Sequence, residues 1–168
     1  TDLTMSTATE GELFYSDTSK EFKVGVTVEA WASGGNVVSG RINPACLGTQ
    51  TAAMFMGGHT PPGAHALSES YDGSTWTEGN NLAISMDMAA GAGTQTAGLC
   101  FGGNQDPNTE TVEYDGTNWA EAGNVNTGKS VICGAGTQTA GLKFSGYPAS
   151  NSTEEYDGSS WTAGGNLG

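Results

Sequence analysis

The stretch "GTQTAGLCFGG", residues 93–103, is written three times with small changes, and this repetition decides the fold class. "GTQTAAMFMGG" occupies residues 48–58 and "GTQTAGLKFSG" residues 136–146, so the copies start 45 and 43 residues apart. A second phrase follows each copy: "YDGSTW" at 71–76, "YDGTNW" at 114–119 and "YDGSSW" at 156–161. A period in the low forties is typical of repeats that contain four short strands.

The pattern inside each repeat predicts four antiparallel strands. A Gly- and Thr-rich segment such as "AAGAGT" gives the first strand, and the apolar "TAGLCF" gives the second. The alternation in "TETVEY" predicts a half-buried third strand, and the Trp opens the fourth. The "DG" pair before each Trp predicts a tight turn, because Gly adopts positive φ without steric cost. Helical periodicity is nearly absent, so we expect an all-β fold.

One four-stranded sheet cannot bury its apolar face alone. Sheets packed face to face around an axis solve this problem, as in a β-propeller. We therefore expect each Trp to lie between neighbouring sheets with the preceding Tyr beside it. The glycines that follow the second strand would let backbones approach closely near the axis.

The repeats divide the chain unevenly. We expect three repeats at about 41–86, 87–129 and 130–168, after an N-terminal arm and degenerate partial blade at 1–40, giving about 3.5 to 4 repeats. Trp31, followed by "ASGGNV", marks the degenerate unit. A small four-bladed ring with an incomplete blade, association of copies, and a longer parent chain are three ways to close the structure. Association or a longer parent is favoured, since open sheet edges invite pairing.

These phrases resemble a known family. A glycine pair after an apolar strand, then a Tyr and a Trp, resembles the kelch motif of β-propellers. The matching residues are Gly57, Gly58, Tyr71 and Trp76, then Gly102, Gly103, Tyr114 and Trp119, then Gly146, Tyr156 and Trp161, with Ser145 in place of the third unit's first glycine. The wording is also similar to kelch-like repeats in structural proteins of bacteriophages, especially marine ones, and "GELFYSDTSKEFKV" is similar to segments of phage tail and fibre proteins.

The resemblance implies a non-enzymatic structural protein of a virion or appendage, such as a tail fibre. Its partners would be copies of itself or further blades of a longer chain, other virion proteins, and a host-surface glycan. The expected location is the virion, or otherwise the cell surface or the secreted fraction. An alternative is a soluble glycan-binding or protein-interaction propeller outside any virus, because propellers host many functions.

Composition excludes several classes of partner. The formal net charge is -13, with only 5 Lys and Arg residues, which argues against nucleic acid and against an anionic membrane surface. No apolar run is long enough for a membrane span, so we expect no membrane insertion. The three cysteines, Cys46, Cys100 and Cys133, lack metal-site spacing, and we expect them to be small apolar strand residues. No metal and no cofactor is expected.

Two enzyme classes with this architecture remain as less favoured alternatives. Galactose-oxidase-like enzymes bind copper through Tyr, Cys and His, and the chain has two histidines, His59 and His65, in one loop. Sialidases grip a carboxylate with several arginines, and Arg41 is the only arginine here, which nearly excludes that class. Two-carboxylate glycoside hydrolysis stays open in principle. However, Asp72, Asp115 and Asp157 recur in every repeat, which favours a structural role and a chain that is not an enzyme.

The least repeated residues lie in the loops between second and third strands. In a four-stranded meander these loops leave the sheet on the same side as the connections between sheets. Variable loops on a rigid scaffold are a common place for binding, and polar amides and aromatics suit sugar hydroxyls. The candidate ligand-binding residues are His59, His65, Asn104, Asp106, Asn108, Tyr147 and Asn151.

Overall fold

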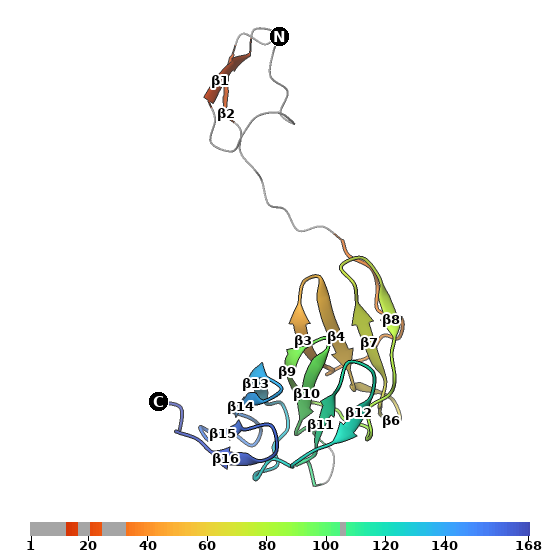
Figure 1. The fold of residues 1–168 in the computed structure, drawn as a ribbon, viewed down its shortest axis with the longest axis vertical. Coiled ribbons are helices and arrows are strands. Elements are labelled where there is room, and N and C mark those ends of the chain that lie inside the picture. Colours follow the sequence, from red (N-terminus) through yellow and green to blue (C-terminus); the bar gives the residue numbers. More distant parts are fainter. Residues whose placement is uncertain (1–12, 17–20, 25–32, 105–106) are drawn as a thin grey trace. The chain divides into compact units, whose positions relative to one another are not determined.

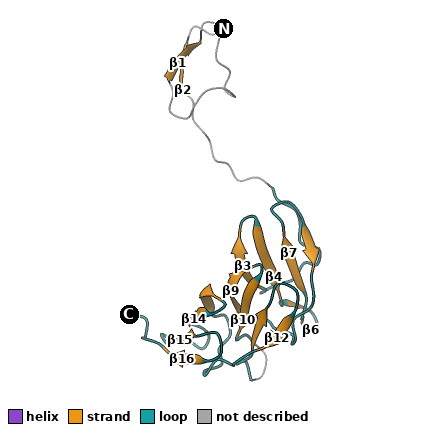
Figure 2. Ribbon diagram, in the orientation of Figure 1, coloured by secondary structure: helices purple, strands orange, loops and turns teal. Residues whose placement is uncertain are grey.

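A computed structural model describes residues 13–16, 21–24, 33–104 and 107–168, and all its regular elements are β-strands (Figures 1 and 2). The chain divides into two units, Thr1–Ser33 and Gly34–Gly168. The first unit contains an antiparallel hairpin of β1 (Leu13–Ser16) and β2 (Glu21–Val24). Trp31 and the strand expected there lie outside the described residues, as does Asp106.

The second unit contains three four-stranded antiparallel sheets, each a simple meander. The first sheet has β3 (Ala45–Thr49), β4 (Ala52–Met56), β7 (Ser68–Tyr71) and β8 (Trp76–Glu78). The second has β9 (Ala90–Thr94), β10 (Ala97–Phe101), β11 (Thr111–Tyr114) and β12 (Trp119–Glu121). The third has β13 (Cys133–Thr137), β14 (Ala140–Phe144), β15 (Thr153–Tyr156) and β16 (Trp161–Ala163). A short hairpin of two strands with two residues each, β5 (His59–Thr60) and β6 (Gly63–Ala64), lies within the loop between β4 and β7.

The strand positions expected from the repeated phrases are confirmed. In each sheet the Tyr that ends the third strand lies opposite the Trp that opens the fourth, for example Tyr114 opposite Trp119. The turn between them is held by the Asp side chain: Asp115 Oδ1 accepts hydrogen bonds from the backbone N–H groups of Thr117 and Asn118 at 2.8 and 2.7 Å. Gly116 follows with φ +93°, a conformation that suits glycine.

Apolar residues form two cores, one at each junction between successive sheets. The first junction, between the first and second sheets, buries Ala45, Leu47, Met54, Met56, Leu82, Met86, Cys100, Val112, Tyr114 and Trp119. The second junction, between the second and third sheets, buries Ala90, Ala92, Leu99, Phe101, Val125, Ile132, Tyr156 and Trp161. At both junctions, the Trp of the later sheet packs against the face of the earlier sheet.

The first strands of the three sheets approach one another closely. A Cβ atom added at Gly91 would lie 2.6 Å from the carbonyl oxygen of Cys46, and one added at Gly134 would lie 2.8 Å from the carbonyl oxygen of Gly91. These positions therefore require glycine, because real Cβ atoms are not found so close to backbone oxygen. The first sheet carries Cys46 at the equivalent position.

The all-β class and the four-stranded antiparallel sheets are confirmed. The described residues form three four-stranded sheets in succession, and no closed ring is found among them. Ring closure as a propeller therefore stays a prediction. Within the described ranges, the chain has no helix of the length and hydropathy needed to cross a membrane.

Candidate functional site: the sheet junctions and the loop end

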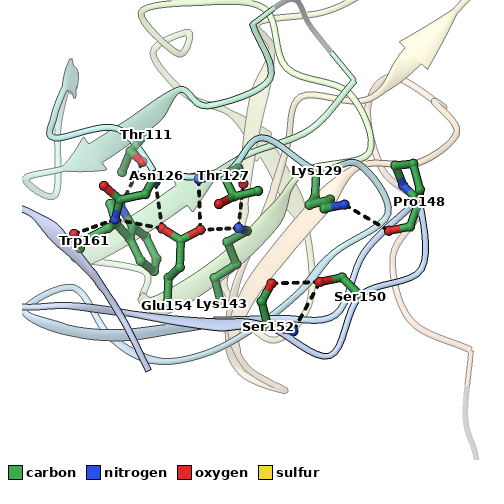
Figure 3. Close-up of polar contacts among 10 residues, drawn as sticks. All are labelled: Thr111, Asn126, Thr127, Lys129, Lys143, Pro148, Ser150, Ser152, Glu154 and Trp161. Atoms are coloured by element: carbon green, nitrogen blue, oxygen red, sulfur yellow. Dashed lines mark hydrogen bonds and ion pairs between the residues drawn. The ribbon is translucent and has the colours of Figure 1, made fainter. Parts of the chain in front are cut away.

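A buried ion pair lies at the second junction. Lys143 Nζ on β14 is 2.6 Å from Glu154 Oε1 on β15, and both side chains are almost completely buried (Figure 3). The backbone N–H groups of Asn126 and Thr127 donate to the two carboxylate oxygens of Glu154 at 2.6 and 3.0 Å. Lys143 also donates to the carbonyl oxygen of Thr127 at 2.7 Å. The pair therefore fixes the connection between the second and third sheets.

The hydrogen bonds decide the ionisation of Glu154. Burial alone would raise the pKa of its carboxyl group. The hydrogen bond and charge of Lys143, with the N–H groups of Asn126 and Thr127, outweigh this and hold the pKa below its ordinary value. Both oxygens of the Glu154 carboxylate accept hydrogen bonds from the chain itself, which argues against a catalytic role for Glu154.

Trp161 joins the same region to the second sheet. Its indole Nε1 donates to Thr111 Oγ1 at 3.1 Å, and its ring centroid lies 4.7 Å from that of Phe101 (Figure 3 labels Trp161 and Thr111). Asn126 Nδ2 donates to the carbonyl oxygen of Trp161 at 2.7 Å. The Trp thus links two sheets, as the repeat pattern predicts.

The first sheet carries a related pair. Arg41 Nη1 lies 2.7 Å from Glu69 Oε1, and the backbone N–H groups of Val38 and Ser39 donate to the same carboxylate. The guanidinium also lies over the ring of Phe55, 4.4 Å from its centroid. The only arginine of the chain is therefore buried in structural contacts, an arrangement that its sequence context did not indicate.

The loops between second and third strands meet the connections between sheets. Gly58 and Gly103 donate backbone hydrogen bonds to the carbonyl oxygens of Met86 and Lys129. The loop between β10 and β11, which contains Asn104, also contacts the connection between the first and second sheets. The Asn104 N–H group donates to the carbonyl oxygen of Asp87 in that connection at 2.7 Å. These loops and connections lie together at one end of the sheets, which we call the loop end, and the candidate residues were expected there.

The two histidines have different partners. His59 Nδ1 is 3.7 Å from Asp87 Oδ2, and the other oxygen of this buried carboxylate, Oδ1, has no hydrogen-bond partner. His65 Nε2 is hydrogen-bonded to Thr60 Oγ1. Among the described residues, no group of three or more His, Cys, Asp or Glu side chains could hold a metal ion.

The other candidates are spread along the loop end. Tyr147 is 70% exposed, and Asn104 and Asn151 are exposed. Asn108 is half-buried and has φ +53°. Two shallow cavities of about 300 and 170 Å³ are lined by other residues. The candidates thus share one end of the sheets but do not converge on either cavity.

The recurring aspartates are bound within their turns. Backbone N–H groups of the two residues that precede Trp lower the pKa of each carboxyl group, to about 2 for Asp157. Each Asp accepts these bonds in the same way, which fits the structural role inferred from its recurrence.

The cysteines differ from one another. Burial raises the pKa of the Cys100 thiol to about 12, whereas Cys46 and Cys133 are exposed. All three lie in strands, as expected, and Cys100 is the buried one. Cys46 and Cys133 lie on opposite outer sheets, where no further described sheet covers them.

Comparison with known proteins does not identify a family. No protein-family model matches the chain, and no curated protein matches it.

Proposed function

We propose that this chain is a non-enzymatic structural protein of a virion or appendage that self-assembles through a kelch-type β-propeller scaffold. The observation that carries the proposal is the difference among the three repeated tryptophans. Trp119 and Trp161 are 7% and 5% exposed at the junctions, whereas Trp76 on the first sheet is only half-buried. A repeated side chain that packs against a preceding sheet in two repeats needs such a neighbour in the third.

The propeller architecture is supported by the way the sheets stack. Each sheet is a meander with its first strand nearest the neighbouring sheets, and the Trp of each later sheet packs on the earlier one. Radial repetition of such sheets is the propeller solution to burying both faces.

The absence of enzymatic activity is proposed because the two buried cations and the repeated aspartates already have structural partners. Arg41 and Lys143 pair with buried glutamates, and the repeated aspartates hold turns. His59 lies beside Asp87, but among the described residues this pair belongs to no group of three or more His, Cys, Asp or Glu side chains that could hold a metal ion.

The virion assignment rests on the resemblance of the repeated phrases to those of phage structural proteins. A host-surface glycan is the proposed ligand of the loop end, where Tyr147 offers an exposed ring and Asn151 an exposed amide. Glycan-array binding by the whole chain, lost in Tyr147→Ala and kept in a Thr162→Ala control on β16, would support this role. Binding that survives Tyr147→Ala and Asn151→Ala together would contradict it.

Electron microscopy tests the scaffold directly. Two-dimensional averages should show a ring of radial sheets around a central axis. An elongated particle without a ring would contradict the propeller. A monomeric closed ring that binds glycan would instead favour the alternative, a soluble binding module outside any virus.

A further inference from the structure

One small cavity at the loop end is formed by equivalent residues of all three sheets. Its volume is about 170 Å³, and its walls come from the two residues that precede the first strand of each sheet. Backbone hydrogen bonds of 3.1 and 3.0 Å join Met88 to Asn43 and Val131 to Met88. Apolar residues make up all but one of the lining residues, which are Asn43, Pro44, Met88, Ala89, Val131 and Ile132.

The backbone at the cavity wall is strained in the same way in each repeat. Asn43, Met88 and Val131 have φ angles of +51°, +56° and +53°. Such angles are uncommon for residues with a Cβ atom and are most unfavourable for a β-branched residue such as Val131. Glycine would remove this strain, and strained positions cluster at functional sites. We therefore interpret the side chains of Met88 and Val131 as functional parts of the cavity wall.

Large apolar side chains are exposed around this cavity. Val131 is 61% exposed, and Ile42, which precedes Asn43, is 59% exposed. Tyr147 is 70% exposed, and its backbone exchanges two hydrogen bonds with Ser130, which precedes Val131. Monomeric proteins rarely gather exposed apolar side chains without a binding role. The loop end therefore carries an apolar patch with a cavity beside it.

Three of the candidate binding residues surround the cavity without lining it. His59, Asn104 and Tyr147 occupy equivalent positions after the second strands. Each donates its backbone N–H group, at 2.7 to 2.8 Å, to a carbonyl oxygen of the residue that directly precedes a lining residue. These acceptors are Ile42, Asp87 and Ser130. The cavity therefore lies among the loops in which ligand binding was expected.

The charges of this unit favour a neutral ligand. In residues 33–104 and 107–168 the cations are Arg41, Lys129 and Lys143. Arg41 and Lys143 form buried ion pairs, and Lys129 Nζ donates to the carbonyl oxygen of Pro148 at 3.2 Å. A sugar carboxylate is best bound by guanidinium groups in a bidentate manner, and the loop end offers none in the described part of the chain.

We infer that this cavity is the acetamido subsite of the proposed glycan site, and that the ligand is a neutral glycan with N-acetylhexosamine units. A cavity of about 150 Å³ holds a group the size of benzene, so this one takes one small substituent rather than a whole sugar. The acetyl methyl group suits the apolar walls, and Asn43, which is exposed, offers an amide for hydrogen bonding. The exposed ring of Tyr147 offers an apolar face to the sugar ring. The inference rests on the proposed glycan binding and specifies the class of sugar.

A pair of soluble trisaccharides tests the acetamido group on the full chain. N,N′,N″-triacetylchitotriose has an acetamido group where cellotriose has a hydroxyl group on each sugar. Isothermal titration calorimetry should show at least about tenfold tighter binding of triacetylchitotriose, since a buried methyl group discriminates by this factor. In saturation-transfer difference NMR, the acetyl methyl protons should receive the most saturation. Equal affinities, or saturation mainly of sugar ring protons, would overturn the acetamido subsite.

Substitutions in the cavity wall separate binding from folding. Val131→Asn removes apolar wall but suits the positive φ, because Asn adopts this conformation more readily than Val. It should weaken binding of triacetylchitotriose at least tenfold, while the midpoint of urea unfolding stays the same or rises. Ala89→Leu fills the cavity and should weaken binding to the same degree. Val38→Asn is the matched control, since Val38 is 55% exposed and lies outside the cavity, and its affinity should equal that of the wild type.

The outcomes distinguish failure of the subsite from failure of glycan binding. Unchanged affinity in Val131→Asn and Ala89→Leu, with binding lost in Tyr147→Ala, would overturn the cavity assignment and leave glycan binding at the loop end standing. An array of neutral and acidic glycans on which the wild type binds nothing would overturn both. A native mass that falls in Val131→Asn, together with no glycan binding by the wild type, would show that another copy covers the cavity and would also overturn both.

Discussion

Trp119→Ala removes the indole that joins the first two sheets. The side chain is 7% exposed, lies in the core of the first junction, and packs against Tyr114 with ring centroids 4.9 Å apart. Burial of about 200 Å² at about 25 cal/mol/Å² is worth about 5 kcal/mol. The buried Nε1 has no hydrogen-bond partner, so its removal returns about 1 kcal/mol. The expected loss is about 3–5 kcal/mol, as for other buried aromatics truncated to Ala.

Urea unfolding followed by far-ultraviolet circular dichroism measures this loss. With a slope of about 2 kcal/mol/M, the midpoint should fall by about 2 M. Because association adds to apparent stability, the measurement belongs at a fixed protein concentration, with the slope compared between variants.

Trp76→Ala is the matched control. The same substitution at a half-buried Trp should cost about 1–2 kcal/mol in the isolated copy. A loss below about 1 kcal/mol for Trp119→Ala, or equal losses for the two variants, would refute the role of Trp119 as a wedge between sheets.

The remaining predictions concern backbone approach, acid stability and the histidines. Gly134→Ala should lower the free energy of unfolding by about 1–3 kcal/mol in urea titrations, because the new Cβ would lie 2.8 Å from the carbonyl oxygen of Gly91; an unchanged midpoint would argue against close packing of the first strands. Because the folded-state pKa of Glu154 is lowered, its stabilising contribution is complete above the ordinary value of 4.5 and is lost as the pH falls through the folded-state pKa. The unfolding free energy of the wild type should therefore fall more steeply on acidification below pH 4.5 than that of Glu154→Gln, and parallel pH profiles would contradict this. His59→Ala with His65→Ala should keep cooperative thermal unfolding and native mass, whereas loss of cooperativity would show that the pair is structural.

The strands could be predicted from the sequence because their signals are local and repeated. The apolar second strand, the Asp-Gly turn and the Trp recur in each repeat, so the same strand assignment applies to all three repeats. Tyr114 and Trp119 illustrate this: their spacing across a tight turn places them opposite each other. The loop end also follows from the meander, since alternate connections must leave a sheet on the same side.

The buried charges could not be predicted in this way. Lys143 lies where the other repeats have Phe55 and Cys100, and its partner Glu154 is on the neighbouring strand. Arg41 and Glu69 are 28 residues apart in the sequence. Their burial depends on the segment with Val38 and Ser39, whose backbone N–H groups donate to Glu69. Exposure of Cys46 and Cys133 depends on which faces of the stack are covered, a property of the arrangement of sheets rather than of any strand.

Native mass by light scattering across a dilution series tests the central claim, that copies of this chain complete one another's sheet stack. The account predicts a concentration-stable multiple of 17.1 kDa. A cooperatively folded monomer across the whole series would contradict it.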